Sequence, residues 1–150
     1  MSEDGLLCLV YVSRAAVPLG EAELLSLLRQ ARNNNSRDRV TGMLLYRQGR
    51  FMQALEGPNA LVQGLYRRIQ IDPRHTQVTT LIKFQPTGRA FDGWSMGFQD
   101  VDRLSVEDRS ALGDGLTAFL DQGFEPATWA DAPHQAIRLL RAFRDAGRTG

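Results

Sequence analysis

The sequence predicts an α+β fold in which a five-stranded sheet has helices on both faces. Two observations predict it. Apolar, strand-forming runs alternate with helical patterns in the order β-α-β-β-α-β-β, and the last third of the chain adds two amphipathic helical patterns. The order is the ferredoxin-like, split βαβ arrangement with one more strand. Its two helices cover one face of the sheet, so we expect the C-terminal helices to cover the other.

The first strand and the first helix have clear boundaries. Residues 6–13 (LLCLVYVS) are apolar and rich in strand formers, which indicates a buried strand. A helix is predicted over residues 21–33, with apolar side chains at helical spacing and acidic residues in its first turn. The asparagines at 33–35 compete for backbone hydrogen bonds, so we expect the helix to end there.

The middle of the chain predicts a hairpin followed by a helix. Residues 40–46 and 50–56 are strand patterns separated by the turn residues Gln48 and Gly49. Pro58 suits the first turn of a helix that Asp72 and Pro73 end. The apolar positions between them have helical spacing.

Two further strands and two helices complete the prediction. The strand patterns cover residues 78–84 and 93–98. Ser105 and Asp108 resemble a capping box at the start of a third helix. The apolar stripe of that helix consists of Leu112, Leu116, Phe119 and Leu120, and the glycines at 113 and 115 weaken it. Asp131 and Pro133 begin a last helix, whose apolar positions are Ile137, Leu140 and Phe143. We expect a domain over residues 1–100 and a helical extension over residues 101–150.

Composition excludes several classes of function. The chain has 150 residues and a formal net charge of +1, which disfavours binding to nucleic acid. Its longest apolar run ends at Val12, far short of the about 18 residues of a membrane-spanning helix, and its acidic start lacks a secretory signal pattern. The single cysteine, Cys8, excludes an internal disulfide, and His75 and His134 have no metal-ligand spacing. We therefore expect a cytoplasmic protein without a metal site and without a membrane partner.

Two strand residues are more polar than their surroundings. By alternation Tyr11 shares a face with Leu9, where a tyrosine of the core is the simpler interpretation. Gln53 shares a face with Phe51, and a buried amide without partners costs about 1–3 kcal/mol. Gln53 therefore needs a hydrogen-bond partner, whether structural or functional.

Other candidates also have two interpretations. Asn35 either caps the first helix or, if the helix continues, points at the sheet. Arg68 is typical of a solvated surface, and Trp94 and Met96 are typical of a core face of the last strand. Together with Tyr11 and Gln53 they describe an apolar pocket with a few convergent polar groups, the usual form of a cofactor site. Such a pocket suits a planar heteroaromatic ring and contains neither a general base nor an activated nucleophile.

From Leu6 to Phe98 the sequence resembles the BLUF domain, a blue-light sensor that uses flavin. The matching stretches stand in the family's order and spacing: LLCLVYVS (6–13), ARNNN (31–35), VTGMLLYRQGRFMQALEGP (40–58), IQIDPRH (69–75) and RAFDGWSMGF (89–98). The resemblance implies a five-stranded ferredoxin-like sheet and a flavin held between the two helices of that domain. The cofactor expected from it is FAD, with FMN or riboflavin also compatible.

The resemblance also implies a role for each matching position. Tyr11 matches the light-active tyrosine, and Gln53 matches the glutamine that links it to the flavin. The positions that match cofactor-binding residues are Asn34, Asn35, Arg68, Asp72 and His75, and those that match the mobile residues of the last strand are Trp94 and Met96. A family serine is replaced by Ala31, which removes one hydrogen bond near the glutamine.

The implied function is a blue-light photoreceptor without an enzymatic activity of its own. Electron and proton transfer from Tyr11 and a hydrogen-bond rearrangement at Gln53 would produce a reversible red shift, passed to an unknown downstream protein or to a change of homo-oligomer. One alternative is an acylphosphatase-like enzyme, although residues 14–17 (RAAV) offer no glycine-rich phosphate loop. The other alternative is a colourless ferredoxin-like interaction module.

Overall fold

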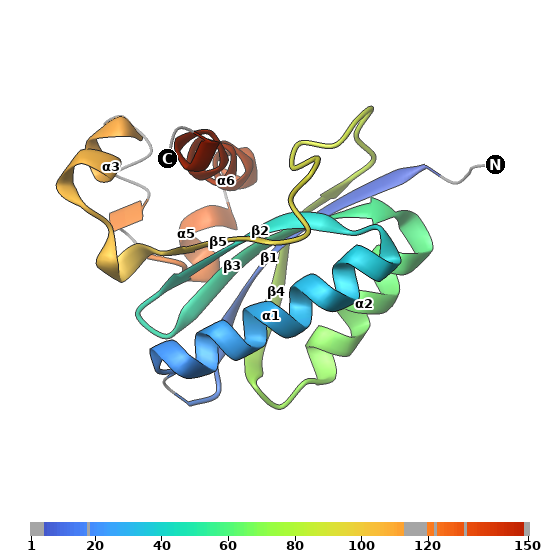
Figure 1. Cartoon of the computed structure of the whole chain (residues 1–150), viewed down its shortest axis with the longest axis horizontal. Helices are drawn as coiled ribbons and strands as arrows, with labels where there is room; N and C mark the ends of the chain where they lie inside the picture. Colours follow the sequence, from blue (N-terminus) through green and yellow to red (C-terminus); the bar gives the residue numbers. More distant parts are fainter. Residues whose placement is uncertain (1–4, 18, 113–119, 122, 131, 149–150) are drawn as a thin grey trace.

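The computed structural model describes residues 5–17, 19–112, 120–121, 123–130 and 132–148, built around a five-stranded sheet (Figure 1). The strands are β1 (Leu6–Ala15), β2 (Thr41–Arg47), β3 (Arg50–Pro58), β4 (His75–Phe84) and β5 (Gly97–Asp100). Their order is β4-β1-β3-β2-β5, with β5 parallel to β2 and the other pairs antiparallel. The predicted α+β fold and its ferredoxin-like strand order are confirmed.

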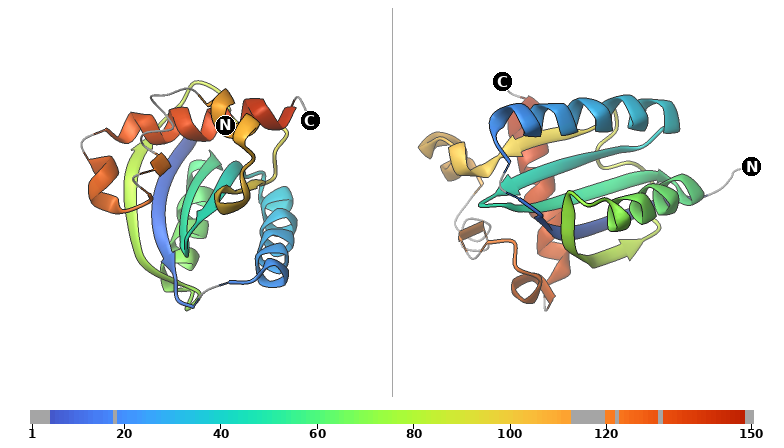
Figure 2. Two further views of the ribbon diagram at one scale, coloured as in Figure 1. Left: turned by 90° about the vertical axis from the view of Figure 1, so that its left-hand side faces the viewer. Right: turned by 90° about the horizontal axis from the view of Figure 1, so that it is seen from below.

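Helices cover both faces of the sheet (Figure 2). On one face lie α1 (Glu21–Asp38) and α2 (Asn59–Ile71), and on the other lie α5 (Pro126–Ala130) and α6 (Pro133–Arg148). Leu28 of α1 and Val62 of α2 belong to the first core cluster, while Trp129 of α5 and Leu140 of α6 belong to the second. The sheet therefore separates two hydrophobic cores.

Burial on both faces explains the continuous apolar run of the first strand. Leu9 and Tyr11 of β1 face α1 and α2, whereas Val10 and Val12 face the C-terminal helices. Strands covered on both faces lose the usual alternation of polar and apolar residues. The predicted placing of Tyr11 on one face with Leu9 is confirmed.

The hairpin between β2 and β3 forms as predicted. Gln48 and Gly49 have φ angles of 47° and 78°, and positive φ at both central residues is typical of a two-residue hairpin turn. Earlier in β2, a Cβ on Gly42 would lie 2.0 Å from the carbonyl oxygen of Ala54 and 3.3 Å from Cε of Met96. Only glycine fits at this position, where β2 lies against the chain segment before β5.

The prediction that the asparagines end the first helix is wrong. α1 continues to Asp38 and ends at Arg39, which has a left-handed φ of 59°. The side chain of Asn35 does not compete for the backbone of its own helix, because its Nδ2 donates to the carbonyl oxygen of Ser95 at 2.9 Å. The alternative in which Asn35 points at the sheet side is therefore the correct one.

The C-terminal extension follows the prediction in part. Ser105 Oγ accepts from the backbone N–H of Asp108 at 3.1 Å, as the capping box requires, and α6 buries Ile137, Leu140 and Phe143 on the open face of the sheet. The helix α3 (Val106–Ala111) buries none of its residues and lies beside the sheet (Figure 1). The described members of the predicted apolar stripe, Leu112 and Leu120, are buried in the core on this open face, so this part of the expectation is confirmed.

Other parts of the extension were missed or lie outside the described residues. The 3-10 turn η1 (Val101–Arg103) follows β5, and the sequence does not predict the short helix α5. The predicted features outside the described residues are Gly113, Gly115, Leu116, Phe119 and Asp131. Among the described helices, none has the length and apolar character that crossing a membrane requires.

Candidate flavin site

Tyr11 and Gln53 lie opposite each other on the neighbouring strands β1 and β3. The Tyr11 hydroxyl donates a hydrogen bond to Oε1 of Gln53, and both side chains are buried. Burial raises the pKa of Tyr11 above its ordinary value of 10.0, so the phenol is neutral at physiological pH. The strand register thus produces the pair that the two sequence motifs suggested.

The other end of the Gln53 amide points to Met96. Nε2 of Gln53 lies 3.2 Å from Sδ of Met96, its only hydrogen-bond partner among the described residues. A thioether sulfur is a weak acceptor. Gln53 is therefore held firmly at its oxygen and loosely at its nitrogen, which leaves the nitrogen available to a better acceptor.

Two consecutive asparagines of α1 border the same region. Asn35 is buried and bonded to Ser95, whereas Asn34 is half-buried and its side chain has no partner within the described part of the chain. Because Asn35 lies inside the helix rather than after it, the two asparagines project from consecutive positions of one helix.

Arg68, Asp72 and His75 border the region from the side of α2 and β4. Arg68 is exposed and lies 3.8 Å from a carboxylate oxygen of Asp38. The hydrogen bond from Arg74 holds the pKa of Asp72 below its ordinary value of 3.8. These charged groups surround the entrance, while the half-buried ring of His75 lies 6.5 Å from the ring of Tyr11.

His75 gives the fold a measurable pH dependence. Its Nδ1 lies 3.0 Å from Oγ of the buried Ser13, and burial lowers its pKa below 6.5, with the Asp72 carboxylate acting in the opposite direction. Below pH 6.5 the unfolded chain binds a proton that the folded chain excludes, so the free energy of unfolding falls as the pH falls.

We expect urea unfolding at pH 7.5 and pH 5.5 to show this loss, and His75→Gln to reduce it. Asp72 titrates below this window, because its folded pKa lies below 3.8. An equal pH dependence in the variant and the natural sequence would contradict the assignment to His75.

These polar side chains surround one cavity of about 210 Å³ between α1, α2 and the sheet. Its lining includes all seven residues that match the family's photoactive and cofactor-binding positions: Tyr11, Asn34, Asn35, Gln53, Arg68, Asp72 and His75. Leu27, Leu44 and Leu65 supply apolar walls. The structure therefore brings together residues that are up to 64 positions apart, and it places Met96 next to them through Gln53.

Trp94 does not belong to this group. The last strand starts at Gly97 rather than at residue 93, so Trp94 and Met96 precede it and do not share a strand face. Met96 packs into the core on the side of α1 and α2, whereas Trp94 packs against the core on the side of α6. The predicted common face is wrong because the chain bends at Ser95, between the two residues, so the extended backbone on which alternation depends starts only at Gly97.

The sequence interpretation missed two residues of this region. Arg32 lies one turn before Asn35 on α1, and its Nε donates to the carbonyl oxygen of Met96 at 2.9 Å. The fully buried Glu56 accepts hydrogen bonds from the backbone N–H groups of Ala90 and Phe91. An arginine on an exposed helix position has no sequence signal for such a role, but a glutamate in an apolar strand does.

Comparison with known proteins identifies the family. A family model described as sensors of blue light using FAD, the BLUF model, matches residues 6–97. The chain belongs to the BLUF family. As a BLUF domain it is a sensor module whose cofactor is FAD, as the resemblance implied.

Relatives with known names support this assignment. The β subunit of the photoactivated adenylate cyclase of Euglena gracilis is 45% identical over 76 residues, which are 51% of this chain and 9% of that protein. The corresponding subunit of Euglena longa is 42% identical over 105 residues, 69% of this chain and 12% of that protein. The chain thus spans about a tenth of the length of these curated relatives.

Solved structures of similar proteins also support the assignment to the BLUF family. The dark-state structure of the BLUF protein BlrB superposes with a TM-score of 0.75 at 30% identity, covering 95% of this chain and 98% of that one. A bacterial light-regulated adenylyl cyclase gives a TM-score of 0.70 at 33% identity, covering 78% of this chain and 33% of that one.

The cavity fits the ring of a flavin. Its inner part offers neutral amides and a phenol between apolar side chains, and its charged groups, including the exposed Arg68 and Arg74, lie at the entrance. Neutral donors and acceptors suit the polar edge of an uncharged ring, and arginines suit phosphate. The volume is below the about 300–1,000 Å³ of typical ligand pockets, so the cavity matches the ring rather than a whole dinucleotide.

Proposed function

We propose that this chain senses blue light with a flavin in the cavity between α1 and α2, through the hydrogen-bond chain Tyr11–Gln53–Met96. The observation that carries the proposal is the amide of Gln53, which is bonded to a phenol at one end and only to a thioether at the other. When bound, the flavin supplies blue-light absorption and, once excited, a strong electron acceptor.

Tyr11 supplies the electron and the proton in this proposal. Its hydroxyl is the only phenol that borders the cavity among the described residues, and the hydrogen bond to Oε1 of Gln53 defines where the proton goes. An amide that receives a proton at oxygen and loses one at nitrogen, or that rotates, exchanges its donor and acceptor ends. The light-induced state of Gln53 then presents a different hydrogen bond to the cavity.

Retention of the flavin depends on the asparagines in this proposal. Asn35→Ala removes a buried amide at the cavity wall and leaves the Ser95 carbonyl oxygen without its donor. The Asn35 amide has a second N–H that Ser95 does not use, and a buried flavin carbonyl that loses this donor costs about 1–3 kcal/mol, so we expect flavin affinity to fall about tenfold. Flavin retained after dialysis measures it, and Gln30→Ala, at the exposed rim of the same cavity, is the matched control. Unchanged retention in Asn35→Ala would contradict the role.

The segment before β5 is the proposed exit for the signal. Its three carbonyl oxygens, those of Trp94, Ser95 and Met96, accept hydrogen bonds from Gly42 N, Asn35 Nδ2 and Arg32 Nε respectively. Met96 also receives the Gln53 amide at its sulfur. A change at Gln53 therefore acts directly on a segment that continues into β5 and the C-terminal extension.

Met96→Ala tests this route. We expect the variant to keep most of its red shift, because Tyr11 and Gln53 are intact, and to lose the light-dependent change in β5 and the extension. Hydrogen exchange of residues 97–112 in the dark and under blue light measures it. Met52→Ala is the matched control, since Met52 is also fully buried but faces the other core. A light-dependent change that is the same in Met96→Ala and the natural sequence would contradict the route.

The whole proposal has a direct spectroscopic test. The full chain, purified from flavin-replete cells, should be yellow, should shift its absorption to the red under blue light and should recover in the dark. A colourless protein, or a flavin spectrum that blue light leaves unchanged, would contradict it. Hydrolysis of an acyl phosphate by the colourless protein would instead support the acylphosphatase alternative.

We further propose that the chain acts as a sensor on another protein rather than as an enzyme. Among the residues that line the cavity no nucleophile is paired with a base, because the Ser13 hydroxyl that contacts His75 is fully buried outside the lining. Related segments occur in photoactivated adenylate cyclases, of which they form a small part. The output would be a downstream protein or a second copy of this chain. Light-dependent elution in size-exclusion chromatography, with and without a candidate partner, distinguishes the two.

A further inference from the structure

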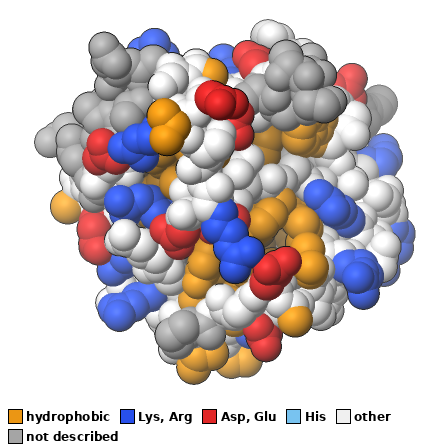
Figure 3. Space-filling model, turned by 60° about the vertical axis from the view of Figure 1, so that its left-hand side comes forward, with side chains coloured by type: hydrophobic (Ala, Val, Ile, Leu, Met, Phe, Trp, Pro, Cys, Tyr) orange, Lys and Arg blue, Asp and Glu red, His pale blue; other side chains and the backbone are white. Residues whose placement is uncertain are grey.

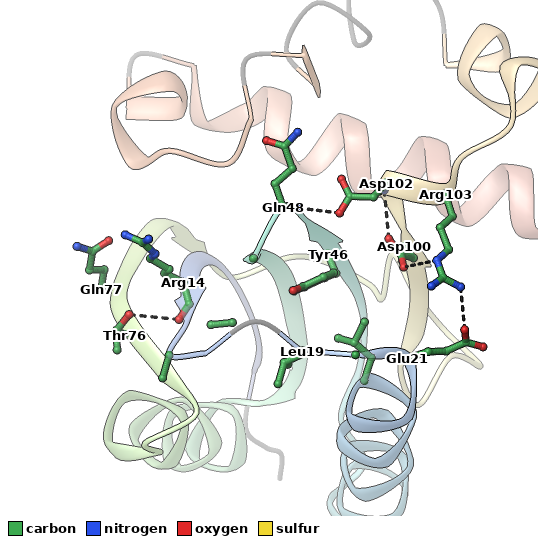
Figure 4. A pocket seen from close by; sticks show the side chains of 15 residues that line it. Arg14, Leu19, Glu21, Tyr46, Gln48, Thr76, Gln77, Asp100, Asp102 and Arg103 are labelled. Carbon is green, nitrogen blue, oxygen red and sulfur yellow. Dashed lines mark hydrogen bonds and ion pairs between the residues drawn. The ribbon is translucent and has the colours of Figure 1, made fainter.

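A second and larger cavity, of about 780 Å³, lies at the end of the sheet near the β2–β3 turn (Figure 4). It shares no lining residue with the flavin cavity. Its volume is within the about 300–1,000 Å³ of small-molecule sites. On this side of the molecule, hydrophobic side chains lie recessed between acidic and basic ones (Figure 3).

Tyr46 is the buried polar residue of this cavity. It is 7% exposed, and its ring packs on Phe51 with centroids 5.1 Å apart. Figure 4 shows its side chain between the two walls of the cavity, with the hydroxyl toward the Arg14 side. No described residue forms a hydrogen bond with this hydroxyl, and its oxygen is not among the fully enclosed side-chain atoms without a partner, so it reaches the open space of the cavity. The hydroxyl is therefore available to a ligand.

The wall formed by β5, η1 and the start of α1 has an excess of negative charge. The Arg103 guanidinium is shared between Glu21, at 2.8 Å, and Asp100, at 3.6 Å. The Asp102 carboxylate accepts only the neutral backbone N–H of Gln48, at 2.8 Å. Three carboxylates thus face one cation, and Asp102 has no positively charged partner among the described residues.

We propose that this cavity binds a small organic cation, with its ammonium group at Asp102 and Asp100 and its apolar body against Leu19, Leu24 and the Tyr46 ring. The Tyr46 ring lies between the two walls and contacts the apolar body, while its hydroxyl, on the Arg14 side, can bond a polar group at the other end of a ligand.

Arg14 limits the number of positive charges that a ligand of this cavity can carry. It lines the opposite wall, and its guanidinium has no ion pair or hydrogen bond with a described residue. A second positive charge on the ligand would lie near this guanidinium, so the site favours a monoamine over a diamine.

The test uses the flavin-loaded full chain in the dark and three probes of one shape. These are 2-phenylethylamine, the neutral 2-phenylethanol and the anionic 3-phenylpropanoate, titrated while backbone amide shifts are followed by NMR. We expect the amine to bind about fivefold more tightly than either other probe, as an exposed ion pair allows. The shifts should centre on Gln48, Thr76 and Asp102. Equal affinities for the amine and the alcohol, or shifts centred on Asn34 and Ile69 of the flavin cavity, would overturn the proposal.

Two variants separate the effect of the Asp102 charge on amine binding from the effect of removing any negative charge. Asp102→Asn keeps an acceptor for the Gln48 N–H, and we expect it to weaken amine binding about threefold to fivefold without changing alcohol binding. Asp92→Asn removes an equal charge at an exposed position that lines neither cavity, and it should leave amine binding unchanged. Equal amine affinities in Asp102→Asn and Asp92→Asn would overturn the role of this wall. Because these measurements are made in the dark, their failure says nothing against light sensing.

Discussion

Tyr11→Phe is expected to retain flavin and to lose the light-induced red shift completely. The substitution removes one oxygen and with it the hydrogen bond to Gln53 Oε1. The ring remains packed against Tyr66, at a centroid distance of 5.3 Å, so the cavity keeps its shape. Difference spectra between dark and illuminated protein measure the effect. Because burial raises the pKa of Tyr11, the red shift of the natural sequence should not decline between pH 7 and about pH 10.

Two further variants make the result specific. Gln53→Leu should also bind flavin and remain spectrally silent, because it removes the amide whose hydrogen bonds are rearranged. Tyr66→Phe is the matched control, since Tyr66 is the neighbouring phenol but its hydroxyl is bonded to Thr80 Oγ1 at 2.7 Å rather than to Gln53. A full red shift in Tyr11→Phe, or its loss in Tyr66→Phe, would remove Tyr11 from its proposed role.

The site could be predicted from sequence to the extent that it depends on strand alternation. Tyr11 and Gln53 lie in long strands buried on both faces, so counting by two places them correctly. Their direct pairing then follows from the antiparallel register of β1 and β3. The rest of the lining, including Asn34, Arg68 and Asp72, is assembled by tertiary contacts alone. No periodicity in the sequence predicts that these residues lie together, and only the family motifs placed them in one site.

The predictions from sequence are wrong where a tertiary contact overrides a local rule. The asparagines at 33–35 are helix terminators by propensity, but the buried Asn35 gains a hydrogen-bond partner in the Ser95 carbonyl and the helix continues. Alternation predicts one strand face for Trp94 and Met96, but the chain bends at Ser95 between them and their side chains pack in different cores. Arg32 acts on the Met96 carbonyl across 64 positions, a contact that no pattern along the chain encodes.

Glu56→Ala is expected to destabilise the fold more than any of the other substitutions. Glu56 is fully buried in β3, and its carboxylate accepts hydrogen bonds from Thr41 Oγ1 at 2.9 Å, Ala90 N at 2.9 Å and Phe91 N at 2.6 Å. Alanine leaves the two backbone N–H groups unpaired beside the buried Phe91. Each buried donor without a partner costs about 1–3 kcal/mol, so we expect a loss of about 3–5 kcal/mol in the free energy of unfolding.

A series of substitutions with graded expected costs tests whether Glu56 anchors the loop before β5. Glu56→Gln keeps one acceptor oxygen but turns an NH₂ group toward a backbone N–H, so its cost should be about 1–3 kcal/mol, between that of alanine and that of the natural residue. Glu107→Ala, in the exposed first turn of α3, should cost less than about 1 kcal/mol. Urea unfolding followed by circular dichroism measures all three. Because Glu56 holds the backbone that leads to Trp94 and Met96, hydrogen exchange at Ala90 and Phe91 should rise in Glu56→Gln even where the fold persists. A cost for Glu56→Ala as small as that for Glu107→Ala would show that the loop before β5 is anchored elsewhere.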